Sequence, residues 1–181
     1  MKIKILLLCL IIVLFSMVSV GTYAYYTKSV VATNTVTSGS VDIIIHETDG
    51  NGEPYPTEPV VILPGDVLNK VVTVENSGNQ PLYLRVRLTP GVNDPALSAH
   101  DCIHMDINDT DWTEQDGYYY YNRALNPGET TPALFTKVTF VGDKVTNAYL
   151  GKMFSLDVAA SAVQSVHNGE SALEAQGWSD S

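Results

Sequence analysis

The densest run of metal-binding residue types in this sequence is His100-Asp101-Cys102-Ile103-His104. On a helix, His100 and His104 would share a face, and zinc accepts imidazole together with carboxylate or thiolate ligands. On a strand, His100, Cys102 and His104 would share a face instead. The HExxH motif that supplies a zinc peptidase with its glutamate base is missing. We therefore expect a polar loop running into a strand, no cofactor, and His100 and His104 as the candidate ligands if a metal binds.

Two acidic segments have the composition of calcium-binding loops. Segment 106–117, DINDTDWTEQDG, carries Asp111 where an EF-hand loop requires glycine. Segment 49–53, DGNGE, contains Asp-Gly and Asn-Gly, which are ordinary turn signals. The sequence also lacks G-x-S-x-G, GxGxxG and P-loop motifs. We therefore predict no calcium site, no catalytic residues and no enzymatic activity.

Residues 118–121 are four consecutive tyrosines. Tyrosine favours strands, and a strand would send two of these rings inward and two outward. Outward rings could bind a sugar or a protein partner, whereas packing against neighbouring strands is the alternative.

The elements that must position these residues are strands. Residues 81–89, PLYLRVRLT, alternate apolar and polar side chains as a half-buried strand does. Many short strands separated by Gly, Pro and Asn turns predict an all-β fold, an antiparallel β-sandwich of the jelly-roll or Ig-like type. Strands are expected at 40–46, 59–63, 68–75, 81–89, 102–107, 117–123, 133–141 and 152–163, and one or two helical turns at 171–176.

The first 24 residues have the layout of a secretory signal peptide. Lys2 and Lys4 precede an apolar run, and small residues lead up to Ala24. We expect cleavage between Ala24 and Tyr25. The alternative is a retained membrane anchor, because the chain carries no charge between Lys4 and Lys28. This uncharged stretch is long enough to cross a bilayer. Either route exports the remainder, and any membrane contact would come only through the uncleaved signal.

The rest of the chain has one cysteine and an acidic composition. The net charge of the 181 residues is −10, which argues against nucleic acid and anionic membrane surfaces as partners. After cleavage Cys102 is alone, so an internal disulfide is excluded, and we expect a small buried side chain there. We divide the sequence into a signal peptide (1–24), an N-terminal segment (25–39) and a β-sandwich domain (40–181).

Three stretches resemble the TasA/camelysin family of exported proteins. Gly21-Thr22-Tyr23-Ala24, followed by a short segment, the Ser38-Gly39-Ser40 turn and Val41-Asp42-Ile43, is similar to that family's signal and mature start. Residues 63–88 resemble its Pro-Gly-Asp turn, strand, Glu-Asn-x-Gly turn and next strand, and residues 154–164 resemble its closing strand. The resemblance implies processing by a SipW-type signal peptidase and a jelly-roll subunit of extracellular (biofilm) matrix fibres.

In such fibres the N-terminal segment of one subunit completes the sheet of its neighbour, by strand addition to an open edge. Residues 27–37, TKSVVATNTVT, suit that role because they are rich in β-branched residues and lack proline. The side chains expected to enter a groove between sheets are those of Val30, Ala32, Asn34 and Val36.

The leading hypothesis is therefore a secreted, non-enzymatic structural protein of the cell surface or biofilm matrix that associates with itself. Camelysins are also described as metallopeptidases, so a cell-surface metallopeptidase that uses His100 and His104 is one alternative. A surface adhesin that binds carbohydrate or protein through exposed tyrosines is another. Filaments, stoichiometric zinc or ligand binding by the monomer would distinguish these three hypotheses.

Overall fold

The computed structural model describes residues 41–56, 63–149 and 151–178, which contain nine strands and two short 3-10 helices. The strands are β1 (Ile43–Thr48), β2 (Val67–Asn69), β3 (Val71–Asn76), β4 (Leu82–Val92), β5 (Ile103–Met105), β6 (Trp112–Gln115), β7 (Tyr118–Tyr121), β8 (Lys137–Phe140) and β9 (Phe154–Gln164). The 3-10 helices are η1 (His100–Cys102) and η2 (Asn147–Tyr149).

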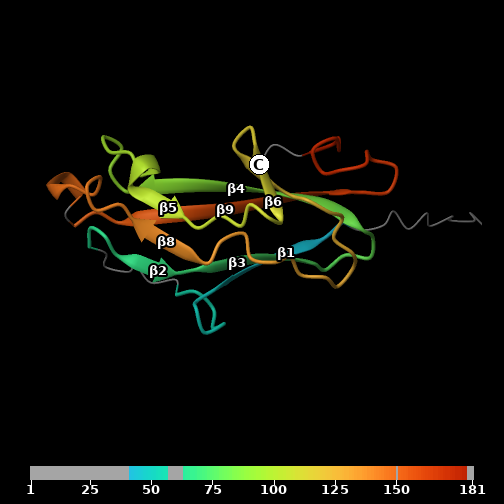
Figure 1. The fold of residues 1–181 in the computed structure, drawn as a ribbon, viewed down its shortest axis with the longest axis horizontal. Coiled ribbons are helices and arrows are strands. Elements are labelled where there is room, and N and C mark those ends of the chain that lie inside the picture. Colours follow the sequence, from blue (N-terminus) through green and yellow to red (C-terminus); the bar gives the residue numbers. More distant parts are fainter. Residues whose placement is uncertain (1–40, 57–62, 150, 179–181) are drawn as a thin grey trace, which may run out of the picture. The chain divides into compact units, whose positions relative to one another are not determined.

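One layer is organised around β2 and β3, which follow each other with only Lys70 between them. β1 pairs antiparallel with β3, and β2 pairs antiparallel with β8, which in turn pairs with β5. Between these ladders, Lys70 N–H donates to Thr136 O at 3.0 Å, and Leu134 N–H donates to Val72 O at 2.8 Å. These bonds join the two ladders, so the layer runs β1, β2/β3, β8, β5 (Figure 1).

The second layer has the strand order β6-β7-β4-β9, with antiparallel pairing throughout. The longest pairing in this layer is the β4–β9 ladder, which runs from Leu82↔Gln164 to Val92↔Phe154. Figure 1 shows β4 and β9 together in one layer and β1, β2 and β3 in the other. The SGNQP turn (77–81) therefore does not close a hairpin: it carries the chain from β3 in the first layer to β4 in the second.

The core lies between the layers and is filled by alternate residues of facing strands. Its members have at most 7% of their surface exposed, and burial of apolar side chains of this kind is the main stabilising term of the fold. From the first layer come Val72, Val74, Ile103, Val138 and Phe140, and from the second come Leu82, Leu84, Val86, Trp112 and Tyr121. The expected antiparallel all-β sandwich is confirmed; the finer assignment as a jelly roll or Ig-like fold stays a prediction.

Most expected strands are present with shifted ends, and two differences matter. Residues 171–176 form a turn rather than the expected helical turns, because Ala172 and Ala175 are anchored against β4 and β7 instead of continuing a helical repeat. β6 was not expected, since Trp112–Gln115 lies inside an acid-rich segment that suggested a loop. The strand expected at 59–63 lies almost entirely outside the described residues.

Candidate functional site

The two candidate metal ligands do not form a metal site. His100 begins η1 and His104 lies in the middle of β5, and both are exposed. Cys102, between them, is only 2% exposed and belongs to the core, so the three side chains do not share a face. Across the described parts of the chain, no three His, Cys, Asp or Glu residues come together in a way that could hold a metal ion.

The carboxylates of the two acidic segments are used to close turns and join strands. Asp49 accepts hydrogen bonds from the N–H groups of Asn51 (2.7 Å) and Glu53 (3.0 Å), and the first of these contributes most to lowering its pKa. Asp106 accepts bonds from Thr136 Oγ1 (2.6 Å) and from the N–H of Lys137 (2.6 Å). The carboxylate oxygens of Asp49 and Asp106 are therefore engaged by the protein's own donors.

The tyrosine strand β7 sends Tyr119 and Tyr121 inward and Tyr118 and Tyr120 outward, as its alternation predicts. The outward pair is covered rather than free. The Arg85 guanidinium lies 3.9 Å from the centre of the Tyr118 ring, and the Trp178 ring meets Tyr120 edge-on with centroids 5.8 Å apart. Arg85 is itself only 7% exposed, so stacking fills this face.

The structure brings together a different set of residues, on the side of the sandwich where β1 and β9 form the edges of their sheets. A hollow of about 510 Å³ opens there, lined by Ile45 and Glu47 of β1 and by Leu156, Asp157 and Val158 of β9. Among the named strands of the described residues, β1 pairs only with β3 and β9 only with β4. At the end of β1, Thr48 also forms a bridge to Pro54, and Tyr55 N–H donates to Glu47 O at 2.9 Å. The hollow is thus bordered by one edge strand from each layer.

The register of β9 shows which of its backbone groups face this open side. Ser165 N–H donates to Pro81 O at 3.1 Å and Asn93 N–H donates to Met153 O at 3.0 Å, just beyond the two ends of the ladder. In an antiparallel pair, hydrogen-bonded residues alternate with residues whose N–H and C=O point the other way. The odd-numbered residues of β9 therefore bond to β4, and the even-numbered ones turn their N–H and C=O groups to the free edge.

The same even-numbered residues carry apolar side chains that the sandwich leaves incompletely covered. Phe154, Leu156, Val158, Ala160 and Ala162 pack against the core but keep part of their surface exposed. The cross-strand neighbours of Ala162 and Ala160, Leu84 and Val86, are 0% exposed. Those of Val158, Leu156 and Phe154 in the second half of β4 are themselves half-buried. The core is therefore closed at the start of β4 and incompletely covered along β9, where an additional strand would cover both the side chains and the backbone groups.

The remaining residues expected to act in processing and assembly, Ala24, Tyr25, Val30, Ala32, Asn34 and Val36, lie outside the described residues. The sequence did identify the common face of Phe154, Leu156, Val158, Ala160 and Ala162. It did not reveal that β9 is an edge strand, because edge position depends on strand order. No helix among the described residues is both long and apolar enough to cross a membrane.

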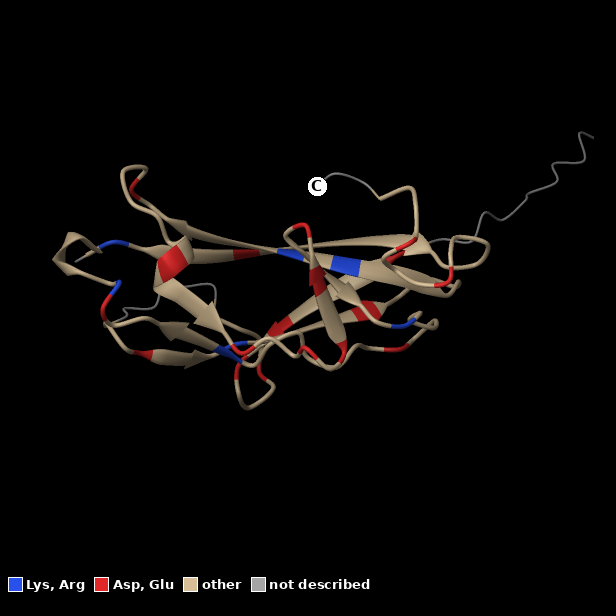
Figure 2. Ribbon diagram, turned by 45° about the horizontal axis from the view of Figure 1, so that its top comes forward, with Lys and Arg blue, Asp and Glu red and all other residues tan. Residues whose placement is uncertain are grey.

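Acidic side chains are distributed over strands and loops of both layers instead of forming one patch (Figure 2). Charge therefore does not by itself mark a site. Comparison of the chain with protein-family models, with curated proteins and with solved structures finds no match.

Proposed function

We propose that this protein is an exported, non-enzymatic structural subunit, of the kind found in TasA-like extracellular fibres, that assembles by strand exchange. The N-terminal segment of one copy, residues 25–37, adds to the free edge of β9 in the next copy. The observation that supports this most directly is the open side of the sandwich, where β9 presents a free backbone edge beside incompletely covered apolar side chains.

The side chains of the β9 edge and of residues 25–37 are complementary in size and polarity. The acceptor offers the small or branched inward side chains of β9, with the hollow beside Ile45 at one end. The segment brings Val30, Ala32, Asn34 and Val36 on one face, which are small or medium-sized and uncharged. An alternating strand inserted at this edge would extend the second layer beyond β9 and cover its open core.

A comparison of free energies indicates that backbone hydrogen bonds alone would not hold a filament together. Roughly ten added hydrogen bonds, at about 0.5–1.5 kcal/mol each, only match the association cost of about 4–15 kcal/mol. Apolar burial contributes about 25 cal/mol per Å² on top of this. The partly exposed face of β9 is therefore as important to the proposal as its free N–H and C=O groups.

Length and position favour β9 over the other edges as the acceptor. β9 has 11 residues, whereas β5 has three and β6 has four. β1 is a six-residue edge strand, and its preceding residue Asp42 is tied to the 77–81 turn by bonds from the N–H groups of Ser77 and Gly78. Because Asp42 is held on the β3 side, only a short link would remain for the segment to fold back onto its own β9.

The test compares the chain beginning at Tyr25 with a chain beginning at Ser38, by electron microscopy and sedimentation. We expect filaments from the first and a folded monomer from the second. A synthetic peptide of residues 27–37 should bind the truncated chain, and the same peptide with Ala32→Asp should not, since a negative charge would be placed against the apolar side chains of β9 and near Glu47 and Asp157.

Two results would overturn the proposal. One is filament formation by the chain that begins at Ser38. The other is a chain beginning at Tyr25 that stays monomeric at every concentration, which would mean that the segment is a free leader or folds onto its own domain.

A further inference from the structure

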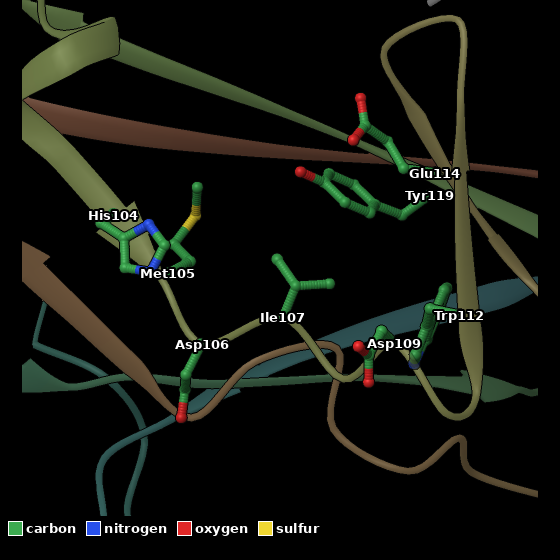
Figure 3. A pocket seen from close by; sticks show the side chains of 8 residues that line it. All are labelled: His104, Met105, Asp106, Ile107, Asp109, Trp112, Glu114 and Tyr119. Atoms are coloured by element: carbon green, nitrogen blue, oxygen red, sulfur yellow. The ribbon is translucent and has the colours of Figure 1, made fainter.

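The opposite side of the sandwich carries a second hollow, between β5 of the first layer and β6 and β7 of the second. Its volume is about 440 Å³. Figure 3 shows the side chains that line it. Its apolar floor comes from Met105 and Ile107, which are half-buried and pack against the core. Its rim and walls include Asp109, Trp112, Glu114 and Tyr119.

A short backbone edge faces this hollow. Val141 N–H donates to Cys102 O at 2.9 Å, and Asp106 N–H to Lys137 O at 3.4 Å, on either side of the β5–β8 ladder. Even-numbered residues of β5 therefore bond to β8. By the alternation of an antiparallel pair, Ile103 and Met105 turn their N–H and C=O groups away from β8, to the side where the hollow lies.

The rim of the hollow is acidic. Asp109 and Glu114 are exposed, and neither takes part in an ion pair within the described residues. Tyr119 stands opposite Glu114 in the β6–β7 register, and its pKa is raised first by burial and then by the charge of Glu114. Figure 3 shows Glu114 above the Tyr119 ring and Asp109 on the other side of the hollow. Such a rim attracts cationic groups.

The wall of the hollow contains a buried hydrogen-bond donor with no acceptor. Trp112 is 2% exposed, and its indole Nε1 has no hydrogen-bond partner within the described residues. In Figure 3 the ring nitrogen lies on the edge of the indole turned towards Asp109. An unmade hydrogen bond at a buried donor costs about 1–3 kcal/mol, so a ligand that displaces the side chains covering this nitrogen and supplies an oxygen acceptor there would recover this energy.

We propose that this hollow binds an extended basic peptide segment of a separate protein. The peptide pairs with the free backbone groups of Ile103 and Met105, a peptide carbonyl accepts the Trp112 N–H, and lysine or arginine side chains meet Asp109 and Glu114. A peptide offers both chemistries at once, whereas a simple amine has no acceptor for the indole. Another copy of this chain is disfavoured as the source because its net charge is −10. This site does not depend on the assembly through β9.

The first experiment follows the indole resonances of the secreted protein by two-dimensional 1H–15N NMR while a synthetic peptide of alternating lysine and valine is added. The chain has two tryptophans, and Trp178→Phe assigns the Trp112 signal. We expect the Trp112 N–H signal to move downfield as the bond forms. The Trp178 signal, on the outer face with Tyr120, should stay in place.

The second experiment measures affinity in variants. Asp109→Asn combined with Glu114→Gln should weaken binding of the peptide by about tenfold, because each lost ion pair contributes up to about 1 kcal/mol. The charge-matched control, Glu53→Gln combined with Glu170→Gln, removes exposed acids elsewhere and should leave affinity unchanged. Added salt should weaken binding of the lysine peptide.

Three results would overturn this proposal: an equal affinity for a peptide of alternating glutamate and valine, an unmoved Trp112 resonance at saturation, or equal losses in the acidic and control variants. An amino-sugar oligosaccharide that shifts Trp112 while the lysine peptide does not would assign the hollow to carbohydrate instead. Peptide binding that is lost in Ala160→Pro would place the peptide in the β9 groove and also refute this site.

Discussion

The side-chain Nδ2 of Asn76 donates a hydrogen bond of 2.9 Å to the carbonyl oxygen of Leu125 in the interior, and a second one of 2.9 Å to Gln80 O. Asn76 is 0% exposed and ends β3, and its Oδ1 also accepts the N–H of Gly78 at 3.0 Å. One side chain thus ties the turn between the layers to the segment that leads towards β8.

Replacing Asn76 with alanine should lower the free energy of unfolding by about 3 kcal/mol, because it leaves buried carbonyl groups without donors. Urea denaturation measures this. The exposed Asn122→Ala, which also removes side-chain hydrogen bonds, should cost about 1 kcal/mol or less. Equal losses in the two variants would show that burial of the Asn76 network adds nothing.

A proline pair tests the orientation of β9. Ala160→Pro removes an N–H that points to the free edge, whereas the neighbouring Ala159→Pro removes an N–H that bonds to β4 at Arg87. We expect Ala160→Pro to fold and to lose filament formation. Ala159→Pro should be less stable than Ala160→Pro by about 1–3 kcal/mol, because the Arg87 carbonyl loses its donor. Filaments of normal length from Ala160→Pro would exclude β9 as the acceptor.

The Asp106 carboxylate should make stability depend on pH in the acid range. Partial burial alone would raise its pKa, but hydrogen bonds from Thr136 and Lys137 outweigh burial and hold the pKa below its ordinary value of 3.8. Since the folded-state pKa lies below the unfolded one, the stabilisation is complete above the unfolded pKa and is lost as pH falls through the folded pKa.

Asp106→Asn should therefore be less stable than the wild type at neutral pH, and the difference should narrow as the pH drops below 3.8. Urea denaturation at several pH values measures the free energy of unfolding of each protein as a function of pH. A constant difference across the acid range would mean that Asp106 acts through its shape and not through its charge.

Cys102 should behave as a core residue and not as a crosslinking site. Its thiol is 2% exposed and lies 3.6 Å from Ser98 O and 3.7 Å from Lys144 O. A thiol reagent should modify the folded protein more than about 100-fold slower than the unfolded chain, because local opening costs free energy. Cys102→Ala should leave the proposed assembly unchanged, and a disulfide-linked dimer of the purified protein would contradict this.

The sequence was sufficient to predict the class of fold because alternation survives in the long strands. Leu82, Leu84 and Val86 on one side of β4 and the matching face of β9 identify strands with one core-facing side directly. The sequence did not reveal that the other side of β4, at Tyr83 and Arg85, is buried as well. The short strand β6 was missed because Trp112 is its only fully buried member, and its neighbours Glu114 and Gln115 are exposed at a sheet edge. A strand of this length carries too little alternation to distinguish it from a loop.

The residues of the two hollows could not be grouped from the sequence, because their proximity depends on the order of the strands. Ile45 and Val158 lie far apart in the sequence and meet only because β1 and β9 are the edges of facing sheets. The histidines drew attention through their spacing, but η1 turns Cys102 into the core and leaves His100 outside. Cys102 itself was predicted to be buried, and this is confirmed.

The groove lined by Ile45 and Val158 joins the first described strand of the fold to the last one. In the proposed assembly, a chain that emerges amino end first has residues 25–37 available early, but its acceptor edge does not exist until β9 pairs with β4. Under this proposal each subunit could donate its segment before it could accept one. Growth at that edge would then wait until the sandwich has folded, so incomplete chains would not join one another.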